Sequence, residues 1–353
     1  METLHRILNE IAASKASDLH IYPGENPFIR VNGVLQKMVG TEFSEDEVKK
    51  IILATSSPRA REILGKQRQV NYAWERGSEG RYRISVFFDR GKFGLAIRVI
   101  PMTPPKFSEL GLPDPIKKTL AKTSGLVIVG SPSGHGKTTT IASLLDFINT
   151  HFEKNIITVE NPVEIKFRDD HSTFIQRAIP LDVPNFYSGL SAAYRLDPDV
   201  VVTDSLNYSD ALDEALFLCE SGCMVIGATD GGSCSQILER IIYSRPAAER
   251  DALKGKLATH VSMVIGQKLV PKFENQGRTA AFDILVNTPQ VKTLIRNENL
   301  VMLRTIQEQD HASGMQTFDR HLASMVQKNL ITPQTAIAYA DDPHEMTGRF
   351  TRK

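Results

Sequence analysis

The sequence has few cysteines, almost no net charge and no long apolar run, and each absence excludes a class of protein. Three cysteines in 353 residues are too few for a disulfide framework. The 42 Lys plus Arg residues nearly balance the 41 Asp plus Glu residues, so overall charge gives no reason to expect direct contact with nucleic acid. Apolar runs such as residues 126–129 are far shorter than the roughly 20 residues of a membrane-spanning helix. The charged N-terminus contains no signal-peptide core. We therefore expect a soluble, cytoplasmic protein.

Hydrophobic residues make up 41% of the chain, enough to build a packed core. At roughly 150 residues per domain, the length suggests about two domains. Residues 1–100 mix short helical and strand-like segments, and this mixture predicts a small N-terminal α+β domain. A helix is expected over residues 1–14, and a second helix is expected to begin after Ser44. The expected strands are 18–22, 28–31, 69–74, 81–89 and 92–100.

A proline-rich segment, residues 101–110, contains Pro101, Pro104 and Pro105, and we interpret it as the interdomain linker. The pattern changes over residues 111–353, where apolar runs alternate with helical segments. This alternation is typical of an α/β domain with buried parallel strands. The expected strands are 126–129, 156–159, 200–202 and 224–226, and the expected helices are 137–148, 210–220 and 234–242. From about residue 289 to 353 the segments are predicted to be helical.

The strongest chemical signal is a strand that runs into a glycine-rich turn and then a helix. This arrangement is typical of a P-loop, in which backbone N–H groups at a helix N-terminus bind phosphates. Ser131 stands where the usual pattern has its first glycine, and Gly130 precedes it. A glycine-rich turn without a ligand is the alternative, and the strand–loop–helix setting favours nucleotide binding. The predicted nucleotide-binding residues are Ser131, Pro132, Ser133, Gly134, His135, Gly136, Lys137, Thr138 and Thr139. Lys137 would reach the β- and γ-phosphates, and Thr138 would bind Mg²⁺.

Several further segments resemble the secretion and pilus motor ATPases, most closely the PilT/PilU-like type IV pilus retraction (twitching motility) ATPases. The segments that carry the resemblance are 16–20, 29–33, 80–83, 96–98, 158–164, 195–202, 287–289 and 314–319. It implies a RecA-like P-loop ATPase core, a PAS-like N-terminal domain and C-terminal helices. It also implies a hexamer that binds ATP and Mg²⁺ between its two domains. Its expected place is the cytoplasmic face of the inner membrane, beside a membrane platform protein of a pilus or secretion machine.

The resemblance assigns acidic residues to ATP hydrolysis. Glu164 corresponds to the residue that activates water, and Glu160 corresponds to another acidic position of the same segment. Ser205 stands where the family has its Walker B glutamate. Asp204 is a possible substitute and a possible Mg²⁺ ligand. Because successive strand residues point to opposite faces, Asp204 can replace the Ser205 position only if the chain bends locally. For Glu164, the alternative to a catalytic role is a solvated carboxylate at the end of a strand.

The histidine elements of the family are missing. Cys223 and Asp230 stand at the histidine positions, and Asp230 would repel a γ-phosphate that it faced. Cys219 and Cys223 lie at helical spacing, and core packing is favoured over a metal site because no second Cys or His pair lies nearby.

Four arginines are possible phosphate contacts, although solvent-exposed arginines are nearly as plausible. These residues are Arg81, Arg83, Arg98 and Arg195.

Two hypotheses follow for function. The first is an active hexameric motor that couples ATP hydrolysis to pilus retraction or a related secretion step. The second is a catalytically weak ATP-binding paralogue that supports an active PilT-like subunit in a homo- or hetero-hexamer. The P-loop and Glu164 favour the first hypothesis, whereas Ser205, Cys223 and Asp230 favour the second.

Overall fold

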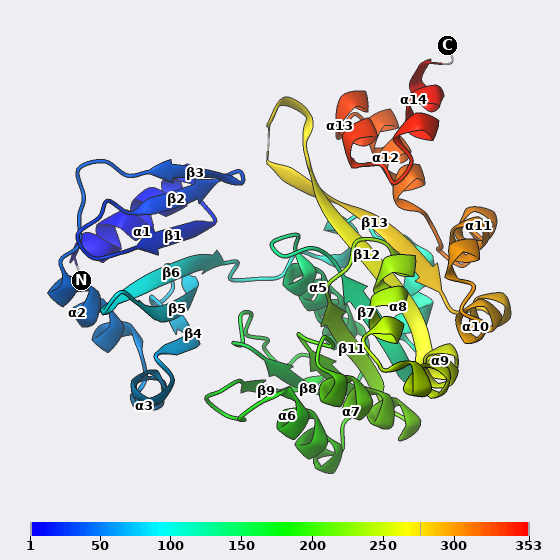
Figure 1. The fold of residues 1–353 in the computed structure, drawn as a ribbon, viewed down its shortest axis with the longest axis horizontal. Coiled ribbons are helices and arrows are strands. Elements are labelled where there is room, and N and C mark those ends of the chain that lie inside the picture. Colours follow the sequence, from blue (N-terminus) through cyan, green and yellow to red (C-terminus); the bar gives the residue numbers. More distant parts are fainter. Residues whose placement is uncertain (1, 276, 352–353) are drawn as a thin grey trace. The chain divides into compact units, whose positions relative to one another are not determined.

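A computed structural model describes residues 2–275 and 277–351 (Figure 1). The chain forms two compact units. The first unit comprises Met1–Thr103, Glu160–Lys166 and Gln176–Asn185. The second unit comprises Pro104–Val159, Phe167–Ile175 and Phe186–Lys353. The chain therefore passes repeatedly from one unit to the other, and the domain limits 1–100, 101–110 and 111–353 stay a prediction.

The first unit is built on a six-stranded sheet of order β3-β2-β1-β6-β5-β4. Each neighbouring pair is antiparallel. Its strands are β1 (Asp18–Ile21), β2 (Phe28–Val31), β3 (Val34–Lys37), β4 (Gln69–Glu75), β5 (Arg81–Asp89) and β6 (Lys92–Ile100). Its helices are α1 (Glu2–Ser14), α2 (Glu45–Thr55) and α3 (Pro58–Gln67).

Helical periodicity places one apolar face of α1 in the core of this unit. Leu4, Ile7, Leu8 and Ile11 are buried in a single cluster with residues of the sheet. The helix α2 begins with the expected cap: the Ser44 side chain accepts a hydrogen bond from the backbone of Glu47, and the Glu47 side chain bonds the Ser44 backbone. This capping box satisfies N–H groups that the first helical turn leaves without partners.

The second sheet has seven strands in the order β13-β12-β7-β11-β10-β8-β9. Its central pairs are parallel, and β12 and β13 pair antiparallel at one edge. The strands are β7 (Gly125–Gly130), β8 (Asn155–Glu160), β9 (Thr173–Ala178), β10 (Val200–Thr203), β11 (Met224–Thr229), β12 (Val261–Pro271) and β13 (Arg278–Val286). Because β7, β10 and β11 are parallel, their carboxyl ends meet at one edge, and this edge carries the phosphate loop.

Helices and short 3₁₀ turns complete the chain. The α-helices are α4 (Lys117–Leu120), α5 (Lys137–His151), α6 (Phe186–Ala193), α7 (Ser209–Glu220), α8 (Cys234–Tyr243), α9 (Ala247–His260), α10 (Pro289–Arg296), α11 (Leu303–Gln309), α12 (Phe318–Gln327), α13 (Pro333–Tyr339) and α14 (Pro343–Thr351). The 3₁₀ turns are η1 (Phe107–Glu109), η2 (Asp114–Ile116), η3 (Tyr194–Leu196), η4 (Phe273–Asn275) and η5 (Leu300–Met302).

The central strands are buried on both faces. On one face, Ile141 and Leu144 of α5 share a cluster with Val127 and Val129 of β7. The helices α7 and α8 also pack on the sheet, through contacts with β11, β7 and β12. Burial on both faces explains why these strands appear in the sequence as continuous apolar runs rather than alternating ones.

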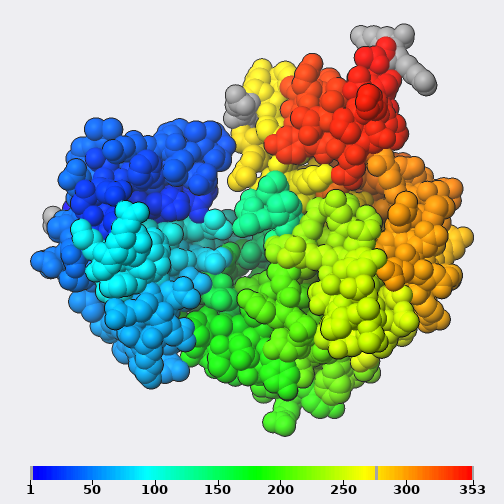
Figure 2. Space-filling model, in the orientation of Figure 1, coloured from blue at the N-terminus to red at the C-terminus, as the bar shows by residue number. Residues whose placement is uncertain are grey.

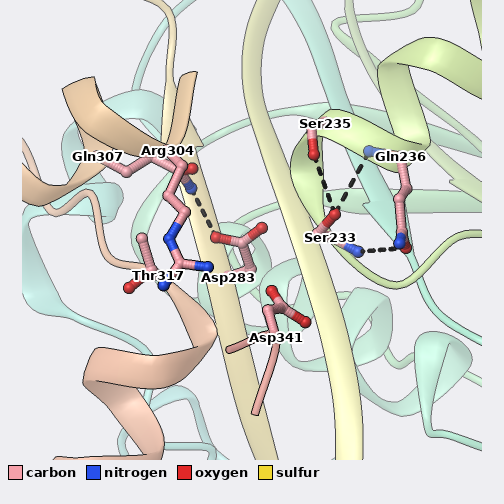
Figure 3. A pocket seen from close by; sticks show the side chains of 8 residues that line it. All are labelled: Ser233, Ser235, Gln236, Asp283, Arg304, Gln307, Thr317 and Asp341. Atoms are coloured by element: carbon pink, nitrogen blue, oxygen red, sulfur yellow. Dashed lines mark hydrogen bonds between the residues drawn. The ribbon is translucent and has the colours of Figure 1, made fainter. Parts of the chain in front are cut away.

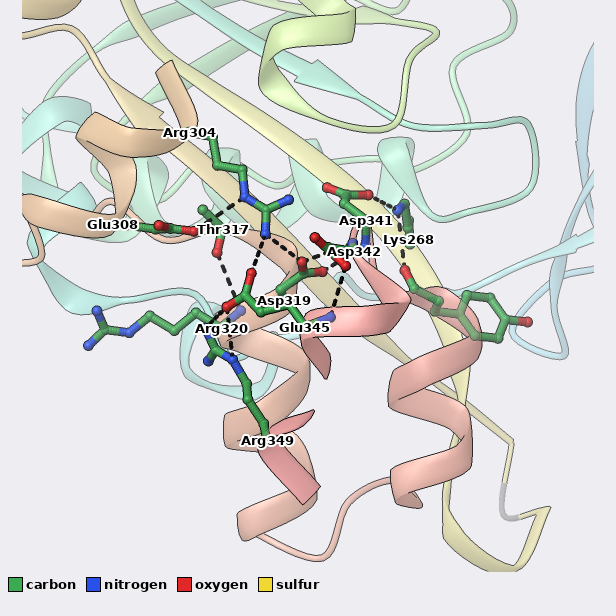
Figure 4. A network of polar contacts seen from close by, with 11 residues as sticks. Lys268, Arg304, Glu308, Thr317, Asp319, Arg320, Asp341, Asp342, Glu345 and Arg349 are labelled. Carbon is green, nitrogen blue, oxygen red and sulfur yellow. Dashed lines mark hydrogen bonds and ion pairs between the residues drawn. The ribbon is translucent and has the colours of Figure 1, made fainter. Parts of the chain in front are cut away.

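The C-terminal helices form a separate small core around Phe318, Leu322 and Met325. Figure 2 shows α12–α14, in red, as a continuous lobe. A polar network also joins this lobe to α11 (Figure 4). In it, the buried Asp319 accepts hydrogen bonds from the backbone of Asp341 and Asp342 and from Arg304, at 2.7, 3.1 and 2.7 Å.

The predicted α/β class is confirmed, and most expected strands and helices end within one or two residues of the observed ones, whereas β11 and α5 each extend three residues beyond their expected ends. The elements that the sequence did not predict are β3, α3, α4, β9, α6, α9, β12 and β13. The antiparallel edge formed by β12 and β13 is the main addition to the expected parallel sheet. Within residues 2–275 and 277–351, no helix is long and apolar enough to cross a membrane.

Candidate nucleotide-binding site

The phosphate loop connects β7 to α5, as predicted. Gly134 and Gly136 adopt φ angles of 75° and 89°, a region that favours glycine. Gly136 is the N-cap of α5, and no side chain caps this end. The first N–H groups of a helix have no intrahelical partners, so this end of α5 is suited to bind an anion such as phosphate.

The loop is supported by Gln267 of β12. The Gln267 amide donates to the His135 carbonyl at 2.7 Å and accepts from the Thr140 hydroxyl at 2.6 Å. A Cβ atom on Gly136 would lie 2.9 Å from the Gln267 amide nitrogen. Gln267 therefore links the turn to the first part of α5, and it requires glycine at position 136.

His135 has a structural contact in the loop. Its Nδ1 atom accepts a hydrogen bond from the Leu269 backbone at 3.0 Å. Burial, with the positive charges of Arg278, Lys137 and Lys268, lowers the pKa of His135. The ring is thus held neutral, which keeps Nδ1 available as an acceptor.

Lys137 extends from the start of α5 across the loop. Its ammonium group donates to the Ser131 carbonyl at 2.7 Å and to Asp230 at 3.0 Å. Asp230 directly follows β11. Asp230 therefore contacts the P-loop lysine directly.

The predicted magnesium ligands both lie beyond the carboxyl ends of strands of the second sheet, β7 and β10, which β11 separates. Thr138 is in the first turn of α5, and Asp204 directly follows β10. The chain bends at Asp204, where it leaves the strand, and Ser205 is buried whereas Asp204 is partly exposed. A hydroxyl and a carboxylate are oxygen donors of the kind that Mg²⁺ prefers, so the residues fit this ion, and their role in binding it stays a prediction.

The acidic segment that contains Glu164 belongs to the first unit. Glu164 pairs with Arg83 through Oε1 at 3.1 Å. Arg81 donates to the Val163 carbonyl at 2.7 Å and to the Glu164 carbonyl. It also donates to the carboxylate of Glu75. The two arginines thus hold this segment in place, and their contact with phosphate stays a prediction.

Glu160 is the last residue of β8. Its carboxylate accepts a hydrogen bond from Gln176 at 3.3 Å, and its backbone carbonyl accepts one from Ile179 at 2.8 Å. These contacts anchor Glu160 within the first unit.

The other two arginines lie in different settings. Arg98 pairs with Asp18 at 2.8 Å on neighbouring strands, whereas Arg195 is exposed in η3. The cysteines Cys219, Cys223 and Cys234 are free and buried, which confirms the core-packing interpretation. No cluster of three or more potential metal ligands of the His, Cys, Asp or Glu type occurs in the described parts of the chain.

A polar cavity of about 260 Å³ lies elsewhere in the second unit, between α8, β13 and α11 (Figure 3). Asp283 accepts hydrogen bonds there from the Cys234 backbone at 2.7 Å and from Gln307 at 2.6 Å. Burial raises the pKa of Asp283 to about 6. The contacts of this carboxylate join three elements, and they give the cavity a structural role.

The sequence did not indicate Gln267 or Asn207 as parts of this site. Gln267 lies far along the chain from the P-loop and belongs to a strand that was not predicted. Asn207 donates to Asp230 at 3.2 Å and lies in the turn after β10. Only the pairing of strands brings these residues to the loop, so no local sequence signal could have identified them.

Comparisons with known proteins agree with the architecture. A family model described as type II/IV secretion system protein matches residues 1–336. The chain is 29% identical to the type IV pilus ATPase PilU of Pseudomonas aeruginosa, over 97% of this chain and 89% of that protein. It is 30% identical to a twitching motility protein of Neisseria gonorrhoeae, over 91% and 86% of the respective chains.

A crystal structure of the pilus retraction motor PilT with bound ADP is 30% identical and superimposes with a TM-score of 0.83, over 96% of this chain and 97% of that one. This similarity confirms the expected RecA-like core with an N-terminal domain. The chain belongs to the type II/IV secretion system protein family, and it is similar to PilT-like ATPases of pili.

Proposed function

We propose that this protein is an ATP-hydrolysing motor subunit of the pilus retraction type. The observation that carries the proposal is the phosphate loop, in which two left-handed glycines and Lys137 meet the uncapped N-terminus of α5. The match to pilus ATPases over nearly the whole chain supports the same conclusion.

The proposed roles of the residues follow from their chemistry. The N–H groups of the loop and Lys137 bind the phosphates of the nucleotide. Thr138 and Asp204 would hold Mg²⁺, which would neutralise charge on the phosphate oxygens when bound. Glu164 is the proposed base that accepts a proton from the attacking water, and its ion pair with Arg83 holds the carboxylate in position.

The proposed motor acts as a ring of subunits at a membrane. By analogy with its relatives, the chain forms a ring of six subunits and acts at the cytoplasmic face of an inner membrane, on the platform protein of a pilus or secretion machine. The motor would convert nucleotide-dependent changes within the ring into movement of that platform.

The test is steady-state ATP turnover of the full-length protein beside Lys137→Ala and Glu164→Gln. Nucleotide binding is titrated on the same samples with and without Mg²⁺. We expect Lys137→Ala to lose binding, because the loop loses the ammonium group that is proposed to bind the phosphates. We expect Glu164→Gln to retain binding and to lose turnover by about 10²-fold or more.

Turnover of the wild type no higher than that of both variants would contradict an autonomous motor. If nucleotide still bound, the protein would instead be a ring subunit that depends on an active partner. A control variant, Glu153→Gln, changes a carboxylate on the loop before β8 and should leave both readouts unchanged.

A further inference from the structure

The position of Asp230 follows from the pairing of two parallel strands. β11 pairs with β7 in a register that places Thr229 opposite Gly130. The Ser131 backbone also donates to the Thr229 carbonyl at 3.3 Å. Asp230, the next residue after Thr229, therefore lies directly beside the beginning of the phosphate loop.

Asp230 shares the ammonium group of Lys137 with the loop itself. The distances from the Lys137 nitrogen are 3.0 Å to the Asp230 carboxylate and 2.7 Å to the Ser131 carbonyl. An ammonium group has three donors, so these two bonds occupy most of its capacity. A phosphate that approaches Lys137 meets an anion that is already in place.

The Asp230 carboxylate is also positioned by other groups of the second unit. Asn207 donates to its second oxygen at 3.2 Å, and Arg240 lies 3.7 Å from the same oxygen. Asn207 is itself fixed, because its carbonyl oxygen accepts from the Thr229 hydroxyl at 2.9 Å and from the Asp230 backbone at 3.4 Å. The carboxylate therefore has a defined position rather than that of a freely rotating surface group.

From this arrangement we infer that Asp230 is a specificity-determining residue that makes the P-loop favour a nucleoside diphosphate over a nucleoside triphosphate. The inference rests on the proposed nucleotide site. The P-loop lysine reaches the β- and γ-phosphates, so a third phosphate adds negative charge near the ammonium group that Asp230 already contacts. Like charges repel each other, so the diphosphate meets less of this repulsion than the triphosphate does.

The experiment compares the affinities of the full-length wild type, Asp230→Asn and Asp213→Asn for ADP and ATP by calorimetric titration. EDTA is present in one series and Mg²⁺ in the other. Asp213→Asn is the matched control, since it removes a carboxylate of the same unit that pairs with Arg245 at the surface. We expect Asp230→Asn to tighten ATP binding about tenfold and ADP binding less than threefold, with no change for the control.

A second variant keeps the test informative if Asp230→Asn is poorly folded. Asn207→Ala retains the charge of Asp230 and removes a group that positions it, so we expect a smaller gain in ATP affinity than for Asp230→Asn. Circular dichroism and thermal melting establish that each variant is folded before titration.

Three results would overturn the inference. Equal changes for ADP and ATP would mean that Asp230 does not discriminate between them. A loss of ATP affinity that occurs only with Mg²⁺ would make Asp230 a metal ligand instead. Wild-type protein that binds neither nucleotide would contradict the proposed function itself, and this outcome is distinct from binding without discrimination.

Discussion

At the scale of single residues, the Gln267 side chain supports the phosphate loop through two hydrogen bonds. We predict that Gln267→Leu weakens nucleotide binding about tenfold and lowers the free energy of unfolding by about 1–3 kcal/mol, because the Thr140 hydroxyl and the His135 carbonyl both lose their partner. Calorimetric titration with ADP and urea unfolding measure the two effects. The exposed Gln290→Leu serves as the control and should change stability by less than about 0.5 kcal/mol. Unchanged ADP affinity in the folded Gln267→Leu protein would contradict the proposed support of the loop.

His321 gives a second prediction at this scale. Burial, followed by the charge of Lys328, lowers the pKa of His321 from 6.5 to about 4. Its Nδ1 atom accepts a hydrogen bond from the Phe282 backbone at 2.9 Å. The unfolded chain therefore takes up the proton first, and stability is lost as the pH falls from about 6.5 towards about 4, by about 3 kcal/mol at most.

The matched variant for this prediction is His321→Asn, whose side-chain oxygen can accept the same backbone bond and does not titrate. Chemical unfolding is followed from pH 4 to pH 7 for both proteins. The stability difference between wild type and variant should shrink or reverse as the pH falls. Parallel curves over this range would show that His321 does not contribute to the pH dependence.

The local chemistry of the site could be predicted from sequence, and its cross-strand partners could not. The strand, glycine turn and lysine of the P-loop are contiguous, so their pattern is visible without a structure. Asp230 was identified only because it replaces a histidine of the family. Its contact with Lys137 depends on the pairing of β7 and β11, which joins positions 93 residues apart.

At the scale of elements, the lobe of α12–α14 depends on the buried carboxylate of Asp319 (Figure 4). We predict that Asp319→Asn speeds backbone hydrogen exchange in α13 and α14 at least about tenfold, because an amide cannot accept all the bonds that the carboxylate accepts. The expected loss of stability is about 2 kcal/mol. Arg304, which donates to Asp319, also pairs with the exposed Glu308, and the control Glu308→Gln should leave exchange nearly unchanged. Equal protection in both variants would show that the network does not hold the lobe.

Elements with a strong local pattern were predicted well, whereas those that depend on tertiary contacts were not. The amphipathic spacing of α1 and the Ser44 cap of α2 are encoded within a few residues. By contrast, β3 is exposed along its whole length and lacks apolar alternation towards a core. The long strands β12 and β13 are stabilised by each other and by β7, and this pairing cannot be read from either segment alone.

At the scale of the whole molecule, the two units can be monitored separately. The single tryptophan, Trp74, belongs to β4 of the first unit, where it packs on Tyr82 with ring centroids 5.6 Å apart. The phosphate loop belongs to the second unit. Tryptophan fluorescence therefore reports on the first unit, whereas far-ultraviolet circular dichroism reports on the helices of both.

We predict that ADP at about 100 times its dissociation constant stabilises the protein by about 2.7 kcal/mol. The expected rise in the dichroism midpoint is about 5–10 °C. Lys137→Ala should lose this shift because it loses binding. A shift that appears only in the fluorescence of Trp74, with the dichroism unchanged, would contradict a nucleotide site in the second unit.

The first unit is built from three separate segments of the chain, and this limits where the protein can be cut or recombined. Arg81 is only 6% exposed, and its guanidinium group is satisfied by carbonyls of residues 163 and 164, which lie some eighty positions further along the chain. A fragment that ends near residue 103 would lose both carbonyl partners and keep only Glu75 of the partners named above. We therefore do not expect the N-terminal sheet to fold stably without the segment that contains residues 163 and 164. If two family members recombined at the proline-rich segment, the N-terminal sheet of one would have to match residues 160–166 of the other. We therefore expect these two parts of the sequence to be inherited together.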